Sequence, residues 1–183
     1  MNQKNACIPW NLARSFIHDA FVKLGVPDED ACICTDVILE SDRRGIESHG
    51  CNRFKPLYID RIKNGLQVPV TRLEILKETP TTIMADAHQG LGMVASYRIM
   101  KKLIQKARLS GLSMGVIKNS SHYGIAGYWS TMASKEGLLG ISGTNTRPLQ
   151  APTFGSAPIL GTNPLAFAFP TDEPFPFLFD GAT

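Results

Sequence analysis

The spacing of hydrophobic residues changes near residue 70, and this change limits the folds open to the chain. Before residue 70 the apolar side chains recur at helical spacing, whereas after it they gather in short strand-like runs. Runs at 81–86 and 113–117, with a helical pattern over 93–110 between them, predict a right-handed strand–helix–strand crossover. We therefore expect a helical N-terminal segment, residues 1–70, followed by an α/β domain, residues 71–183.

Three helices are predicted before residue 70. The first spans residues 9–24, and its apolar spacing places Leu12 and Phe16 on the inward face. Asp28 can cap the second helix, and a third is expected over residues 52–64. Further strands are expected at 73–76, 138–143, 165–169 and 176–180.

Charge and hydropathy argue against several classes of protein. The formal net charge is +3 and the basic residues are scattered, so no nucleic-acid partner is expected. No apolar run approaches the roughly 18 to 20 residues that span a bilayer, and the N-terminus lacks a signal-peptide pattern. We therefore expect no membrane association and a cytoplasmic protein. The 4 cysteines are expected to be reduced thiols rather than disulfides or a zinc site.

A glycine motif, Gly90-Leu91-Gly92-Met93-Val94-Ala95, matches the dinucleotide-binding fingerprint and follows a predicted strand. That fingerprint also requires an acidic residue about 20 residues further on, which holds the ribose hydroxyls. Residues 108–120 contain no acidic residue. We therefore favour a glycine turn that lets strand and helix approach closely over a Rossmann site.

Two histidine segments carry the candidate chemistry. His49 is followed by Arg53, whose guanidinium can pair bidentately with the carboxylate of a small acid. His122 follows a predicted strand, at the edge of an α/β sheet where ligands bind. A histidine, with an ordinary pKa of about 6.5, can take a hydroxyl proton and return it. Ser120 and Ser121 are expected to cap the next helix.

Other chemistries find little support in the sequence. His49 and His122 lie far apart without an H-E-x-x-H pattern or a third clustered acid, so no metal site is expected. A hydrolase would need an activated nucleophile, and the chain has no G-x-S-x-G elbow. Taken alone, His49 could equally be a hydrogen-bonded loop histidine.

Four ordered motifs resemble segments of the malate/L-lactate/ureidoglycolate dehydrogenase family. Ser41–Arg53 resembles A-D-x-R-G-x-x-S-H-G-x-x-R, and Asn119–Gly124 resembles N-S-x-H-F-G. Gly161–Ala166 resembles G-T-N-P-L-A, and Asp180–Thr183 resembles D-M-A-T. The resemblance covers the whole chain but only the N-terminal half of the family's length. The apolar run near residue 177, which enters a glycine turn, also suggests a truncated chain.

The resemblance implies a fold, an activity and site residues. The fold would be a malate/L-lactate dehydrogenase-like α/β fold whose mixed-sheet cofactor-binding domain is not a Rossmann fold. The activity would be hydride transfer between NAD or NADP and a small 2-hydroxy or 2-oxo acid, such as malate or lactate, in a homodimer. His122 would be the acid/base, with His49 beside it in the catalytic set, and His49 and Arg53 would bind the substrate carboxylate. The cofactor would be lined by Thr146, Asp180, Gly181 and Ala182.

Three positions depart from the family pattern. Leu57 stands where the family often has an aromatic residue, and Tyr58, which we assign to substrate binding, comes one place later. Arg147 replaces a small residue, and its cation could hold a second substrate carboxylate, favouring malate, or a cofactor phosphate. Gly181 replaces the usual methionine, which removes packing beside the cofactor.

Two alternatives stay open. The same scaffold could reduce a cyclic imino acid, a piperideine or pyrroline carboxylate, because the histidine could exchange a proton with nitrogen instead of oxygen. The chain could also be a non-catalytic fragment, since half of the family's length is absent.

Overall fold

The computed structural model describes residues 7–182, which form two compact units. Unit 1 contains the chain up to Glu74 together with Asp86–Ala95 and Ile117–Gly124. Unit 2 contains Ile75–Ala85, Ser96–Val116 and the chain from Ile125 onward. Each unit is therefore built from separate stretches of sequence, and the domain boundary at residue 70 stays a prediction.

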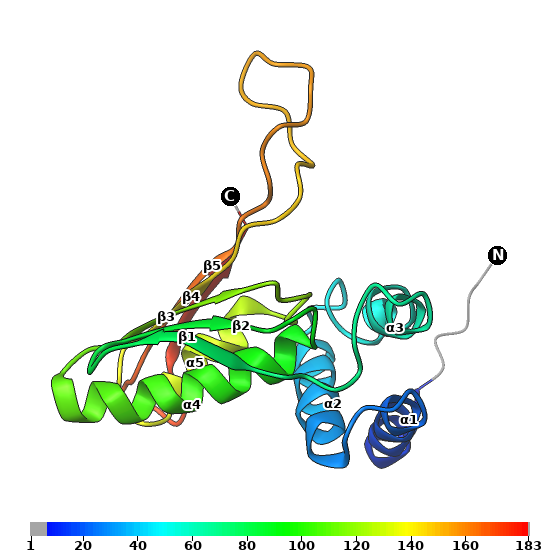
Figure 1. Ribbon diagram of the computed structural model, residues 1–183, viewed down its shortest axis with the longest axis horizontal. Helices are drawn as coiled ribbons and strands as arrows, with labels where there is room; N and C mark the ends of the chain where they lie inside the picture. Colours follow the sequence, from blue (N-terminus) through cyan, green and yellow to red (C-terminus); the bar gives the residue numbers. More distant parts are fainter. Residues whose placement is uncertain (1–6, 183) are drawn as a thin grey trace. The chain divides into compact units, whose positions relative to one another are not determined.

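Helices α1 (Trp10–Lys23) and α2 (Asp28–Arg43) pack against each other in unit 1 (Figure 1). The inward face predicted for α1 is only partly confirmed. Ile17 and Phe21 are buried, but Leu12 and Phe16 are 59% and 65% exposed. A neighbouring helix buries only the side chains that face it. The apolar face of α1 is wider than the part that α2 covers, so its outer side chains stay exposed.

The predicted cap of α2 is wrong. Pro27 occupies the cap position without a side-chain hydrogen bond, and Asp28 is the first helical residue. There its carboxylate, with those of Glu29 and Asp30, lies in the first turn, where negative charge is favourable to the helix dipole.

The third predicted helix is irregular. A 3-10 turn, Cys51–Arg53, is followed by a π turn, Lys55–Ile59, and by α3 (Asp60–Lys63). Pro56 lies in the first turn of the π segment, as expected for a proline in a helix. A π turn contains one residue more per hydrogen-bonded ring than an α-helix, so it shifts the side chains that follow it.

The predicted crossover is present between β2 and β3. Strands β1 (Glu74–Glu78), β2 (Thr82–Asp86) and β3 (Met114–Lys118) form a sheet in that order, and α4 (Gly92–Ser110) joins β2 to β3 (Figure 1). The N–H of Met114 donates to the carbonyl of Thr81 and that of Ala87 to the carbonyl of Lys118. Thr81 precedes Ala87 and Met114 precedes Lys118, so residue numbers increase in the same direction along both strands. Strands β2 and β3 are therefore parallel.

The glycine motif makes a close approach within unit 1. A Cβ on Gly92 would lie 2.1 Å from the carbonyl oxygen of Ser121, and one on Gly90 would lie 2.8 Å from the side chain of Thr71. His88 and Gln89, just before the motif, have positive φ angles of 46° and 63°. The expected tight glycine turn is thus confirmed.

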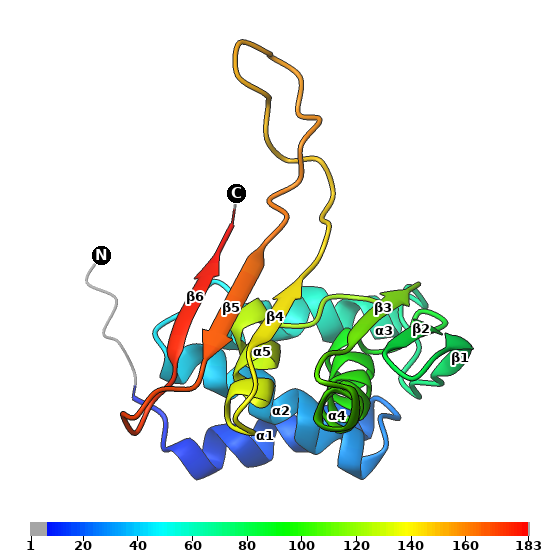
Figure 2. The ribbon, with the colours of Figure 1, turned by 90° about the vertical axis from the view of Figure 1, so that its left-hand side faces the viewer.

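A second sheet lies in unit 2. Strands β4 (Gly140–Gly143), β5 (Leu165–Phe169) and β6 (Phe177–Gly181) are antiparallel, and α5 (Ala126–Ser134) packs against them (Figure 2). Buried Trp129, Ala166 and Ala168 lie in these elements. The long loop between β4 and β5 extends beyond the end of this sheet. No helix within residues 7–182 is long and apolar enough to cross a membrane.

Gly92→Ala is expected to destabilise the protein, because the new methyl group would meet backbone atoms of Ser121 that cannot rotate away. Overpacking of this kind lowers the free energy of unfolding by about 1 to 3 kcal/mol. Denaturant unfolding measures the change. Gln105→Ala, at an exposed position of the same helix, is the control and should change the free energy by no more than about 0.5 kcal/mol. Wild-type stability in Gly92→Ala would contradict the close approach.

Candidate functional site

Ser121 fixes the segment that carries His122. Its hydroxyl accepts hydrogen bonds from the N–H of Gly92, at 3.0 Å, and from the side-chain amide of Gln67, and donates to the carbonyl of Gly90 at 2.9 Å. Ser121 therefore caps α4, which precedes it in the chain. The prediction that it caps the next helix is wrong, because the segment folds back onto the N-terminus of α4.

Asn119 anchors the same segment from its other end. It has a positive φ of 49°, and its amide donates to the carboxylate of Asp86 at 2.8 Å. The backbone N–H of His88 donates to the other oxygen of Asp86, also at 2.8 Å. These two hydrogen bonds, that of His88 foremost, hold the pKa of Asp86 below its ordinary value.

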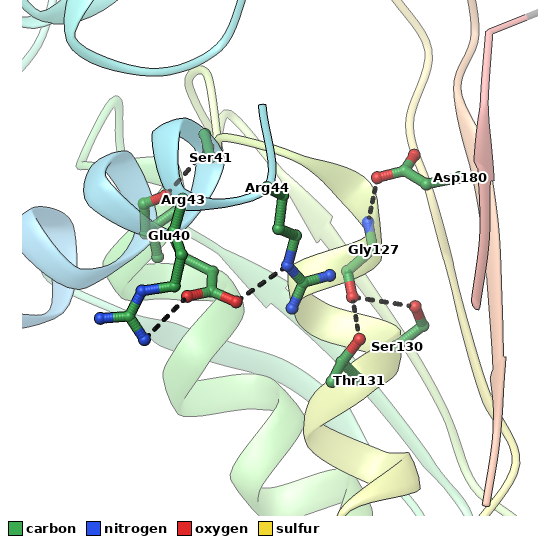
Figure 3. Close-up of polar contacts among 9 residues, drawn as sticks. Glu40, Ser41, Arg43, Arg44, Gly127, Ser130, Thr131 and Asp180 are labelled. Atoms are coloured by element: carbon green, nitrogen blue, oxygen red, sulfur yellow. Dashed lines mark hydrogen bonds and ion pairs between the residues drawn. The ribbon is translucent and has the colours of Figure 1, made fainter. Parts of the chain in front are cut away.

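The turn that carries His49 is attached to the end of α2. The carboxylate of Asp42 accepts the N–H of Cys51 at 2.9 Å, and it lies only 1.8 Å from where a Cβ of Gly50 would be. Burial, aided by a hydrogen bond to Asp42, raises the pKa of the Cys51 thiol to about 12. Two of the three arginines in the Ser41–Arg53 motif, Arg43 and Arg44, pair with Glu40 of α2 (Figure 3).

His49, Tyr58 and His122 meet in unit 1. The imidazole rings of His49 and His122 stack with centroids 5.6 Å apart and planes inclined by 26°. The Tyr58 hydroxyl lies 2.6 Å from Nδ1 of His122, and the N–H of Gly124 donates to the same nitrogen at 3.2 Å. The hydroxyl of Ser48 lies 2.9 Å from Nδ1 of His49. The structure thus brings both histidine segments to one place.

The environment of His122 keeps its ring neutral. The pKa of His122 is lowered to about 4 from an ordinary 6.5. Burial is the first cause, because a protein interior disfavours the charged imidazolium. Electrostatic interactions with His49 and with the positive charges of Arg53 and Arg61 lower this pKa further. At neutral pH the ring is therefore in the form that can accept a proton.

Arg53 is anchored to the turn that carries His49. Its Nε donates to the carbonyl of Ser48 at 2.8 Å, while the residue as a whole is exposed. This bond uses Nε alone, and the Nη groups of a guanidinium are able to pair with a carboxylate. The positive charge of Arg53 also helps to lower the pKa of His122.

Tyr58, assigned to substrate binding from the sequence, lies beside His122. Its side chain is fully buried, and its hydroxyl faces the His122 ring. Burial holds the pKa of Tyr58 well above its ordinary value, and the hydroxyl therefore keeps its proton. The π turn Lys55–Ile59 explains how a tyrosine one place late in the sequence reaches this point. Counting residues along a regular helix would not have placed Tyr58 beside His122.

The residues assigned to the cofactor lie in unit 2, around one end of the β4–β5–β6 sheet. Gly181 pairs with Leu165, which pairs with Gly143 of β4, three residues before Thr146. The hydroxyl of Thr146 accepts the N–H of Thr162 at 2.8 Å. Gly161 is needed beside them, since its Cβ would lie 2.5 Å from the carbonyl oxygen of Thr146.

Two of the residues assigned to the cofactor, Asp180 and Gly181, also make contacts within the protein. The carboxylate of Asp180 accepts the N–H of Gly127, in the first turn of α5, at 2.7 Å (Figure 3). A Cβ on Gly181 would lie 2.9 Å from the ring of Phe179. Ala182 and Arg147 are exposed, and Thr183 lies outside the described residues. Threonine hydroxyls, backbone groups and an exposed cation form a donor set that fits the hydroxyl, amide and phosphate groups of a nicotinamide nucleotide.

One group of possible metal ligands lies apart from the histidine pair. His18 of α1 and Asp28 and Cys32 of α2 have ligand atoms within 4.8 Å of one another. The Nε2 of His18 is 3.2 Å from the Asp28 carboxylate, which is largely exposed.

Comparisons with known proteins identify the relatives of this chain. The family model described as malate/L-lactate dehydrogenase matches residues 8–183. Malate dehydrogenase of Pyrococcus horikoshii is 47% identical over 176 residues, 96% of this chain and 48% of that protein. L-sulfolactate dehydrogenase of Methanocaldococcus jannaschii is 42% identical over 170 residues, 93% of this chain and 49% of that protein. The chain spans about half the length of the curated relatives it matches.

Solved structures agree with the sequence relatives and confirm the predicted fold class. Malate dehydrogenase from Entamoeba histolytica has a TM-score of 0.96 and 44% identity, covering 98% of this chain and 50% of that chain. A more distant structure, the delta1-piperideine-2-carboxylate reductase of Pseudomonas syringae, has a TM-score of 0.89 and 25% identity, covering 98% of this chain and 54% of that chain. The four ordered motifs, the fold and these matches lead to one conclusion: the chain belongs to the malate/L-lactate dehydrogenase family.

Proposed function

We propose that the whole protein transfers a hydride between NAD or NADP and carbon 2 of a small 2-hydroxy or 2-oxo acid, with malate as the first candidate. The observation that carries the proposal is the partly buried imidazole of His122, which stacks on His49 and whose pKa is lowered by burial and by neighbouring charges, that of Arg53 among them. It pairs a proton carrier with a group that binds carboxylates, in a chain that belongs to a dehydrogenase family. In keeping with the resemblance, we propose a cytoplasmic homodimer.

Each residue then has a separate task. Arg53 pairs with the substrate carboxylate through its Nη groups, and His49 lies against the His122 ring as its catalytic neighbour. His122 takes the proton of the 2-hydroxyl group as the C–H bond breaks, and returns it to the carbonyl oxygen in the reverse reaction. Thr146, Asp180, Gly181 and Ala182 would hold the nicotinamide nucleotide, which would supply the hydride acceptor or donor when bound.

A second candidate function is reduction of a cyclic imino acid, because the chain shares its fold with the delta1-piperideine-2-carboxylate reductase of Pseudomonas syringae. A panel of 2-oxo acids and cyclic imino acids, offered with NADH and NADPH to the full-length enzyme, separates the two reactions. Turnover of imino acids alone would replace the proposed substrate class. If the 183-residue chain is a non-catalytic fragment, it should show no turnover on its own under conditions in which the full-length enzyme is active.

Replacing His122 by Ala in the full-length enzyme should lower kcat by about 10² to 10⁴, the usual contribution of a general acid/base. Binding of NADH, followed by its fluorescence, should persist, because no residue assigned to the cofactor is changed. His18→Ala, on α1, removes an imidazole elsewhere in the chain and should leave kcat near the wild-type value. Undiminished turnover in His122→Ala would sink the assignment.

The pH dependence should run in opposite directions for the two reactions. Oxidation needs neutral His122, so its kcat/KM should fall as the pH drops through about 4. Reduction needs the protonated ring, so its kcat/KM should rise toward that pH. Initial rates across the acid range measure both limbs, and circular dichroism at each pH excludes unfolding. Two limbs of the same sign would contradict the role of His122.

Replacing Arg53 and replacing Arg147 should have different effects on kcat/KM. Arg53→Gln removes the charge-assisted pair with the carboxylate common to all substrates, and should lower kcat/KM by about 10- to 100-fold for malate and lactate alike. Arg147→Gln should lower kcat/KM for malate more than for lactate, if its exposed cation holds the second carboxylate. A loss confined to NADPH-linked rates would instead assign Arg147 to the cofactor phosphate.

A further inference from the structure

The hydroxyl of Tyr58 makes the shorter of the two hydrogen bonds to His122. It lies 2.6 Å from Nδ1, and the tyrosine side chain that carries it is fully buried. The Tyr58 ring packs edge-on against Phe21, with centroids 5.9 Å apart. Packing therefore fixes the ring and holds the hydroxyl against the imidazole.

Two groups of different ability reach Nδ1 of His122. The backbone N–H of Gly124, at 3.2 Å, can only donate, so it favours a neutral ring whose proton is on Nε2. The Tyr58 hydroxyl can donate or accept, so it is compatible with a proton on Nδ1. Within residues 7–182 it is the one group on this nitrogen that can accept.

We propose that Tyr58 is a positioning residue that accepts a hydrogen bond from Nδ1–H of His122 and so leaves Nε2 to exchange the proton with the substrate. The inference rests on the proposed function, in which His122 carries that proton. A neutral ring with its proton on Nδ1 has a bare Nε2 that takes the hydroxyl proton. The imidazolium that results still carries Nδ1–H, so the bond to Tyr58 persists through both states, and in both of them Nδ1 has no lone pair left to accept the N–H of Gly124. This role replaces the substrate contact expected from the sequence.

Tyr58→Phe tests the role, because it keeps the buried ring and removes only the hydroxyl. In the full-length enzyme kcat should fall by about 10-fold or more, since a hydrogen bond to the charged ring is lost. The KM for the acid should stay within about twofold, because the substrate itself loses no contact. Tyr97→Phe, in α4 within unit 2, removes the same atom elsewhere and should leave both constants unchanged.

Other outcomes of the same experiment overturn the proposal. A raised KM with unchanged kcat would mean that Tyr58 contacts the substrate directly. A lower melting temperature with unchanged kinetics would mean that the hydroxyl serves only the stability of unit 1.

Nitrogen-15 NMR of the histidine side chains gives a readout that needs no turnover. Signals that disappear in His122→Ala assign the ring. In the wild type Nδ1 of His122 should carry the proton, and in Tyr58→Phe the proton should move to Nε2, because only the Gly124 donor remains. The same protonated nitrogen in both proteins would overturn the proposal. Since no substrate is present, this result is independent of turnover, whereas a fully active His122→Ala would refute the proposed function instead.

Discussion

One hydroxyl group, that of Ser121, connects the stretches of sequence that make up unit 1. Its hydrogen bonds reach Gln67, the carbonyl of Gly90 and the N–H of Gly92, which belong to different parts of the chain. The missing side chain of Gly92 is the condition for this contact, because any Cβ would collide with the Ser121 backbone. His122 is the next residue, so the position of the imidazole depends on a hydroxyl and on a glycine that themselves perform no chemistry.

Much of the fold could be predicted because its signals are local. Helical spacing located α1 and α2, and the alternation of strand-like runs with a helical pattern located β2, α4 and β3. The exposure of Leu12 and the capping of α4 by Ser121 could not be predicted, since both depend on which distant segment lies alongside. Spacing shows that a side chain is apolar or can form a hydrogen bond, and only tertiary contacts select its partner.

The candidate site, like the fold, could be predicted from the sequence only in part. The motifs indicated His49, Arg53 and His122, and the structure places the two imidazoles in a stack. The bond between Tyr58 and His122 was hidden by the irregular helix that contains the tyrosine. The lowered pKa of His122 was hidden as well, because burial and the approach of neighbouring charges belong to the folded chain. The four residues assigned to the cofactor lie in unit 2 and were indicated by motif alone.

The discontinuous build of unit 1 also bears on the order of folding. Tyr58 and His122 are 64 positions apart, and the whole crossover from β2 through α4 to β3 lies between them. Contacts of such long range require the entropy of a large loop to be lost before any bond compensates for it, which slows folding. On the ribosome, where the N-terminal part emerges first, the three helices of unit 1 can assemble early. The contact between Tyr58 and His122 forms only when residue 122 has left the exit tunnel and packed against that helical surface.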